Sequence, residues 1–291
     1  MLFCGSGVAL VTPFNTNGEV DFFELKRLID FQIASGTQAI IILGTTGESP
    51  TISFEEREKI INFALCEVDH KIPVIVGTGS NSTSHSIKLT KQAETLGADG
   101  VLVVSPYYNK TNQHGLFLHF RAIALCTKLP VILYNVPSRT GVNILPETVL
   151  KLSKIKNIVG IKEASGNLSQ IAEICKKSKK SFAVYSGDDL LTLPILSLGA
   201  HGVISVTANA EPEKVQMLCN FAKKHDFFNA KRIHDMLFEL NRALFLDVNP
   251  ICIKYYLSLK GFSVGKPRLP LTEPDSETKN KLKEVFERYE N

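Results

Sequence analysis

The chain of 291 residues is 44% hydrophobic and 21% charged, a composition typical of a globular protein with a sizeable apolar core. Its 33 basic and 29 acidic side chains leave a net charge of only +4, and the one dense basic run, 176–180, follows a helical pattern. That run is expected to be a solvated helix end, so a nucleic-acid partner is not predicted.

The cysteine, histidine and hydropathy patterns narrow the class of protein further. The six cysteines form no CxxC pair and the seven histidines no HExxH, so neither a metal site nor a cofactor is predicted. The first residues lack the pattern of a secretion signal, and no apolar stretch approaches the ~18–20 residues that span a bilayer. We therefore expect a cytoplasmic protein that acts on small molecules, without a membrane partner.

Short β-branched segments recur eight times along the chain and predict eight strands. Their ranges, in chain order, are 7–14, 39–48, 73–81, 100–109, 130–137, 157–167, 182–189 and 202–209. Segments of helical period lie between them. In 21–36, for example, apolar residues recur at steps of three and four, and a glycine at position 36 suits a helix end.

This alternation predicts an α/β protein, specifically a (β/α)8 TIM barrel. Near-continuous Val, Ile and Leu in each strand indicate a parallel sheet covered by helices, and eight units fit a closed barrel. A doubly wound open sheet is the alternative, disfavoured because no GxGxxG follows the first strand. We expect residues 1–224 to form the barrel that carries the active site and residues 225–291 to form a C-terminal helical extension.

The active site of such a barrel lies where the strands end, and those ends carry a concentration of polar side chains. The set is Thr12, Thr45, Thr46, Glu48, Thr78, Ser80, Asn81, Tyr107, Tyr108, Asn109, Tyr134, Asn135, Arg139, Lys162, Ser165, Asp188, Asp189, Ser205, Thr207 and Asn209. Any one of these could simply serve a turn. Two tyrosines, an arginine and a lysine on one rim indicate a site.

Lys162 is the most informative of these residues. It lies within a strand between Gly160 and Ala164, which share its face, so its ammonium loses water and the neutral amine is favoured. Tyr134, one strand earlier, has the parity of Ile132 and is expected to point into the barrel. An amine beside a phenol suits imine chemistry, with Lys162 attacking a ketone and Tyr134 moving protons.

Other interpretations remain open at this point. Lys162 could be a structural lysine whose tip reaches solvent or a carboxylate, and the barrel could be a catalytically silent binding protein. A phosphate-binding barrel using the turn 186–189 is disfavoured, because Asp188 and Asp189 would repel the anion.

Five motifs in order, GTTGE (44–48), YYN (107–109), YNVPSRTG (134–141), GIKEASGN (160–167) and GVISVTAN (202–209), resemble the dihydrodipicolinate synthase family of pyruvate-dependent class I aldolases. The resemblance extends into the C-terminal segment, including FLDVNPICIKYYL and RLPLTEP. It implies a lyase that condenses pyruvate with L-aspartate 4-semialdehyde on the route to diaminopimelate and lysine.

The resemblance also implies a role for each matching residue. Lys162 would form the Schiff base and Tyr134 would donate and accept protons. Thr45 and Tyr108 would complete a proton relay, with Tyr108 supplied by a neighbouring subunit of a homotetramer. The groups implied for carboxylate binding are Thr46, the backbone at Ile204, nearby Gly187 and, for the semialdehyde, Arg139.

Two features bear on specificity and regulation within the family. GTTGE and Arg139 favour the synthase over the alternatives, N-acetylneuraminate lyase and 2-keto-3-deoxy sugar acid aldolases. Many members bind lysine as a feedback inhibitor at a subunit interface. The positions of that pocket that match here are Ser49, Asn81 and Tyr107. The positions that differ are Pro50, Phe54, Arg57 and His85. His85 replaces a glutamate, so weak or absent lysine inhibition is predicted.

Overall fold

Eight parallel strands form a closed barrel in the computed structural model, which describes residues 2–290. Each strand pairs with its neighbours in chain order, and β1 closes the ring by pairing with β8. The strands are β1 Gly5–Ala9, β2 Ala39–Ile42, β3 Val74–Gly77, β4 Gly100–Val104, β5 Val131–Asn135, β6 Ile158–Glu163, β7 Ala183–Ser186 and β8 Gly202–Ser205. The predicted TIM barrel is therefore confirmed.

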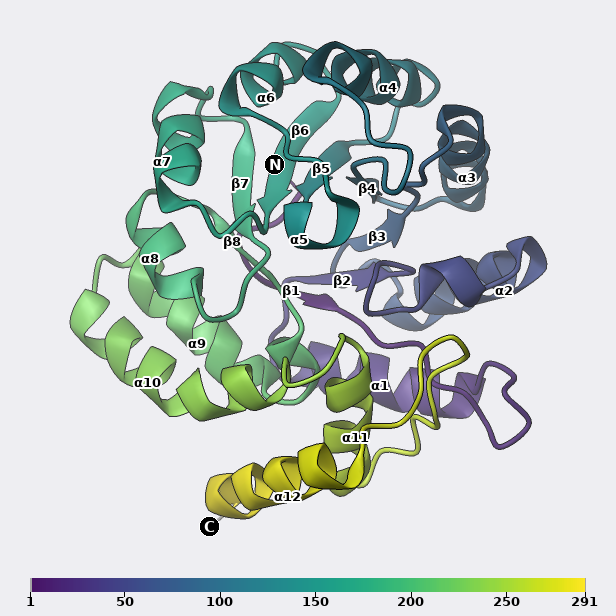
Figure 1. Ribbon diagram of the computed structural model, residues 1–291, viewed down its shortest axis with the longest axis vertical. Helices are drawn as coiled ribbons and strands as arrows, with labels where there is room; N and C mark the ends of the chain where they lie inside the picture. The colour runs from purple at the N-terminus through teal and green to yellow at the C-terminus, as the bar shows by residue number, and fades with distance from the viewer. Residues whose placement is uncertain (1, 291) are drawn as a thin grey trace.

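Helices surround the strands on the outside of the ring, except for the short helix α5 (Pro137–Thr140), which lies within the ring over β5 in this view (Figure 1). They are α1 Phe22–Ala34, α2 Phe54–Val68, α3 Thr83–Leu96, α4 Gln113–Leu125, α5 Pro137–Thr140, α6 Pro146–Leu152, α7 Leu168–Lys177, α8 Thr192–Ser197, α9 Pro212–Lys223, α10 Phe227–Ala243, α11 Ile251–Leu259 and α12 Ser276–Glu290, with 3₁₀ turns η1 Ser49–Thr51 and η2 Thr207–Asn209. Helix α9 follows the last strand, and α10 to α12 complete the chain.

Local sequence accounts for many of the helix ends. Ser53 and Glu56 form a reciprocal capping box at the start of α2, and Asn167 caps α7 through the backbone N–H of Gln170. Gly97 ends α3 in the left-handed conformation, with φ of 91°. These caps satisfy backbone groups that the helices leave unpaired.

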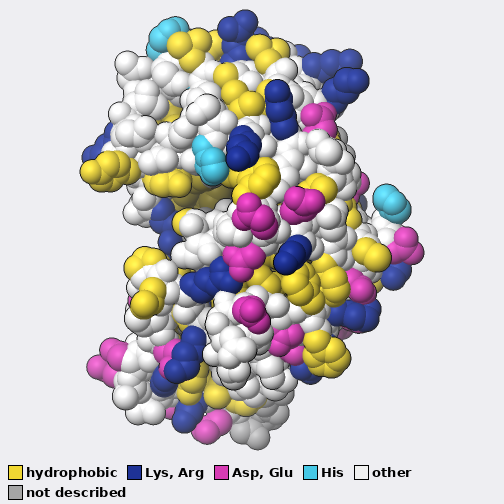
Figure 2. Space-filling view, turned by 90° about the vertical axis from the view of Figure 1, so that its right-hand side faces the viewer, with side chains coloured by type: hydrophobic (Ala, Val, Ile, Leu, Met, Phe, Trp, Pro, Cys, Tyr) yellow, Lys and Arg dark blue, Asp and Glu magenta, His cyan; other side chains and the backbone are white. Residues whose placement is uncertain are grey.

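Two apolar layers result from the alternation of side chains along each strand. The larger layer lies between strands and helices and includes Val8, Val103 and Ile161. The smaller one fills the barrel interior and includes Ile132 and Ile204. On the face drawn in Figure 2, acidic and basic side chains are interspersed with single hydrophobic ones, and none of the helices within residues 2–290 has the length and apolarity to cross a membrane.

Packing of the helices buries the titratable side chain of His119. It belongs to α4, is 5% exposed, and its Nδ1 is 2.9 Å from the hydroxyl of Thr83 at the start of α3. Burial lowers the pKa of His119 from 6.5 to about 4. The folded protein thus keeps this imidazole neutral at a pH where the unfolded chain binds a proton.

We expect the protein to lose stability as the pH falls from 6.5 toward 4, because protonation of His119 favours the unfolded chain. Between about pH 7.5 and about pH 5, the contribution of this residue to the free energy of unfolding should fall by about 2 kcal/mol. Urea denaturation of the wild type and of a His119→Gln variant at these two pH values measures this contribution. Equal loss of stability in the two proteins would contradict this account.

Candidate active site

Lys162 and Tyr134 lie side by side where β6 and β5 end. The parallel register pairs the two residues directly, and the Lys162 Nζ lies 4.4 Å from the centre of the Tyr134 ring. Both are buried, at 5% and 6% exposure. Tyr134 packs with Ile132 and Val136 in the barrel interior, whereas Ile161 packs outside, so the predicted facing of the strands is confirmed.

Small residues make room for the lysine side chain. A Cβ added at Gly187 would lie 2.9 Å from the Lys162 Cε and 2.9 Å from the Cβ of Ala164. A Cβ at Gly160 would lie 2.6 Å from the carbonyl oxygen of Ala183. Among the ion pairs found within residues 2–290, none involves Lys162. The amine is thus held in place by packing and keeps its nitrogen available.

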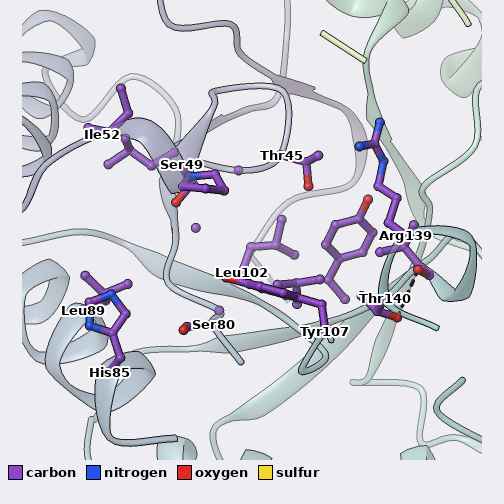
Figure 3. A pocket seen from close by; sticks show the side chains of 18 of the residues that line it. Thr45, Ser49, Ile52, Ser80, His85, Leu89, Leu102, Tyr107, Arg139 and Thr140 are labelled. Carbon is purple, nitrogen blue, oxygen red and sulfur yellow. Dashed lines mark hydrogen bonds between the residues drawn. The ribbon is translucent and has the colours of Figure 1, made fainter. Parts of the chain in front are cut away.

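Two adjoining cavities meet at Tyr134, and Val136 and Arg139 line both of them. One, of about 670 Å³, is lined by Lys162 and Thr46. The other, of about 460 Å³, is lined by a set that includes Thr45, Ser49, Arg57, Ser80, His85 and Tyr107. Figure 3 shows Thr45 and Arg139 at one end of this second cavity and His85 at the other. The phenol of Tyr134 therefore lies between the lysine and a chain of polar groups.

The loop after β2 supplies both threonines. Its backbone is unusual, because Leu43 and Glu48 both adopt the left-handed conformation, each with φ of 56°. Thr12, which follows β1, donates its hydroxyl proton to the carbonyl of Gly47 at 2.7 Å. This loop directs Thr45 into one cavity and Thr46 into the other.

Arg139 enters from the short helix α5 that follows β5. Its guanidinium donates to the carbonyl oxygen of Asn249 at 3.1 Å. The Asn249 amide in turn donates to the hydroxyl oxygen of Thr46 at 2.9 Å. That hydroxyl accepts a bond here and donates none among the hydrogen bonds found within residues 2–290, so its proton can be given to a ligand.

Two of the predicted site residues lie apart from these cavities. Ile204 is 1% exposed in the barrel interior, next to the last residue of β8, and lines neither cavity. Tyr108 is 91% exposed, with φ of 69°, and lines neither cavity of the single chain. Gly187, by contrast, lines the cavity of Lys162.

Buried carboxyl groups support the strand ends from outside the cavities. Glu163 accepts hydrogen bonds from Asn135, Ser165 and Gln170, and burial raises its pKa despite them. Asp189 accepts from the Ser205 hydroxyl at 2.5 Å, and burial raises its pKa too. In the part of the chain the structure describes, no cluster of three metal-binding side chains is found.

Asn249 was missed by the sequence reasoning, as were the neighbouring residues that line the Lys162 cavity, Phe245, Leu246, Asp247 and Val248. They lie between α10 and α11, far beyond the last strand, so neither periodicity nor strand-end position could assign them to the site. The motif FLDVNP, at 245–250, was the only available signal.

Comparison with known proteins identifies the family of the chain. The Dihydrodipicolinate synthetase family matches residues 2–289. The chain belongs to this family. It is 50% identical to the 4-hydroxy-tetrahydrodipicolinate synthase of Alkaliphilus oremlandii over 281 residues, which cover 97% of each chain.

Solved structures of the family agree in fold over nearly the whole chain. The dihydrodipicolinate synthase of Aquifex aeolicus is 49% identical, with a TM-score of 0.97 and coverage of 99% of this chain and 98% of that one. The enzyme of Thermotoga maritima is 45% identical, with a TM-score of 0.98 and coverage of 100% and 99%. The resemblance inferred from five motifs is thus confirmed at the level of the family.

Gly187→Ala should impair the use of pyruvate, because the added methyl group would overlap the Lys162 side chain. A shift of the amine by a fraction of an ångström to 1 Å is expected to lower kcat/KM for pyruvate by roughly 10- to 100-fold. Steady-state kinetics with both substrates measures this.

Gly36→Ala is a control for the added methyl group, since a Cβ there would meet no atom within 4 Å and the residue, just after α1, lines neither cavity. Its kcat/KM should stay close to that of the wild type. If Gly187→Ala retained the wild-type value as well, the space at Gly187 would not matter for the lysine.

Proposed function

We propose that the protein is a 4-hydroxy-tetrahydrodipicolinate synthase, a lyase that condenses pyruvate with L-aspartate 4-semialdehyde in lysine and diaminopimelate biosynthesis. The observation that carries the proposal is the direct strand pairing of Lys162 with Tyr134 inside a closed barrel, which puts the Lys162 Nζ 4.4 Å from the centre of the Tyr134 ring. Family membership over residues 2–289 supports the same activity.

In this proposal Lys162 is the nucleophile. Its neutral amine attacks the keto carbon of pyruvate, and the carbinolamine loses water to give a protonated imine. The imine draws electrons, so a methyl proton leaves and an enamine forms. The enamine carbon bonds to the aldehyde carbon of the semialdehyde, and the amino group of that substrate then displaces Lys162 and closes a ring.

Tyr134 moves the protons that these steps release and require. Its phenol lies between the lysine cavity and the cavity that contains Thr45, so a proton can pass between them. Thr45 continues the relay, and Tyr108 is proposed to complete it from a neighbouring subunit. The 91% exposure of Tyr108 in the single chain supports that role, because a large exposed aromatic ring suits a subunit contact.

The substrate carboxylates are assigned to separate donors. Thr46, whose hydroxyl proton can be given to a ligand, and the backbone at Ile204 would hold the carboxylate of pyruvate, with Gly187 close by. Arg139 would bind the carboxylate of the semialdehyde, because it lines both cavities and its planar group offers paired donors.

Assembly and compartment are also part of the proposal. If Tyr108 completes the relay of a neighbour, the active unit is at least a dimer, and a homotetramer built from two such dimers satisfies every site. We place residues 1–224 as the barrel with the active site, residues 225–291 as its helical extension, and the enzyme in the cytoplasm.

Tyr134→Phe should lower kcat by roughly 10²- to 10⁴-fold, the usual contribution of a general acid–base group.

A coupled assay of the wild-type enzyme supplies pyruvate with aspartate semialdehyde, N-acetylmannosamine or glyceraldehyde as the acceptor. Turnover is expected with the semialdehyde alone. Comparable turnover with either sugar would exclude the synthase and favour a sugar-acid aldolase or sialic acid lyase.

Lysine should inhibit the enzyme weakly or not at all. Arg57 is 2% exposed and donates to the Ser49 hydroxyl at 3.0 Å, and the cavity that both residues line with His85 contains no carboxylate from the described chain. The ammonium groups of lysine would therefore meet a cation without a counter-ion. Initial rates with lysine up to about 1 mM test this, and half-inhibition at micromolar lysine would contradict it.

A further inference from the structure

The loop that carries Thr45 and Thr46 is tied to helix α11 by a buried ion pair. The Lys254 Nζ lies 2.8 Å from the Oε1 of Glu48, and both side chains are 1% exposed. Glu48 ends the loop after β2, whereas Lys254 lies 206 residues later in the chain. Such a buried pair is costly to desolvate and persists only when its remaining polar atoms are satisfied.

The remaining atoms of the pair are indeed satisfied. The ammonium of Lys254 also donates to the carbonyl oxygens of Thr12 at 3.0 Å and Lys266 at 3.3 Å. The second carboxylate oxygen of Glu48 accepts the backbone N–H of Arg268 at 2.8 Å. Lys254 lies 4.2 Å from the centre of the Phe14 ring. Three segments, residues 12–14 after β1, the β2 loop and residues 266–268, therefore meet α11 at this one contact.

Glu48 is well placed to control the geometry of the loop. It holds a left-handed backbone, with φ of 56°, that side chains other than glycine rarely adopt without support. Its backbone N–H donates to the carbonyl of Thr45 at 3.1 Å. Fixing the Glu48 side chain therefore fixes the turn in which Thr45 and Thr46 lie.

A second contact reaches the same loop from just before α11. Asn249 donates to the Thr46 hydroxyl and accepts from Arg139. With Lys254, the C-terminal segment thus holds the loop at two points. Of these two contacts, Lys254–Glu48 is the ion pair, and both of its residues lie outside the two cavities.

We propose that Lys254 is a positioning residue for the condensation: by holding Glu48, it sets the place of Thr45 and Thr46 beside Lys162 and Tyr134. The inference rests on the proposed function, since those threonines are assigned there. Lys254 itself lines neither cavity of the site.

The test compares Lys254→Met with the matched control Lys260→Met. Lys260, at the end of α11, forms an ion pair with Glu211 at 2.7 Å that lies away from the loop. Per folded molecule, Lys254→Met should lose roughly 10- to 100-fold in kcat/KM for the two-substrate reaction, because the threonines shift. Lys260→Met should stay within about twofold of the wild type.

Trapping with pyruvate and borohydride separates positioning from collapse of the barrel. Lys162 and Tyr134 are held by strands, so Lys254→Met should still reach full labelling at saturating pyruvate. The double variant Glu48→Gln/Lys254→Met removes both buried charges. It should melt closer to the wild type than Lys254→Met does while keeping the lowered kcat/KM, a split that a purely stabilising role would not produce.

If Lys254→Met does not fold, Glu48→Gln decides the question, because the amide keeps the shape but has one acceptor oxygen and cannot accept from both Lys254 and the Arg268 N–H. A kcat/KM lowered about tenfold with labelling intact would support the proposal. Wild-type kcat/KM in any folded variant of the pair, or recovery of activity in parallel with melting temperature, would overturn it. Failure of the wild type to label would instead reject the proposed function.

Discussion

The register between β5 and β6 is the constraint on which the site depends. In a closed parallel barrel every strand is fixed by two neighbours, so a one-residue slip would turn Lys162 or Tyr134 out of the interior. Just beyond this pair, Asn135 and Glu163 are also in register and hydrogen-bonded on the outer face. An amine and a phenol are therefore held together by backbone pairing and by a polar contact behind them.

Around that fixed pair, the adaptable parts of the site come from loops and from the C-terminal segment. The threonine loop has two left-handed residues, and it is braced by Thr12, Asn249 and Lys254. Strands thus position the amine proposed to form the covalent bond and the phenol proposed to move protons, and long-range polar contacts position the groups proposed to hold carboxylates and continue the relay. This division explains why residues beyond the last strand belong to the site.

The barrel, its eight strands and the inward facing of Lys162 could be predicted from sequence, because period-two burial and strand-end position are local signals. The contacts of Asn249 and Lys254 could not, since each depends on how a segment some 200 residues away in the chain packs. The position of Tyr108 was equally beyond local patterns, because the residue is 91% exposed and lines neither cavity of its own chain. The part each of these residues plays in catalysis remains a proposal.

The central claim is that the amine at position 162 captures a keto acid covalently. The most direct measurement is borohydride reduction of the wild-type enzyme with pyruvate, followed by peptide mapping by mass spectrometry. We predict one reduced pyruvyl group per chain, located on Lys162, with loss of activity in proportion to labelling. An unlabelled and fully active enzyme, or a label on another lysine, would contradict the account.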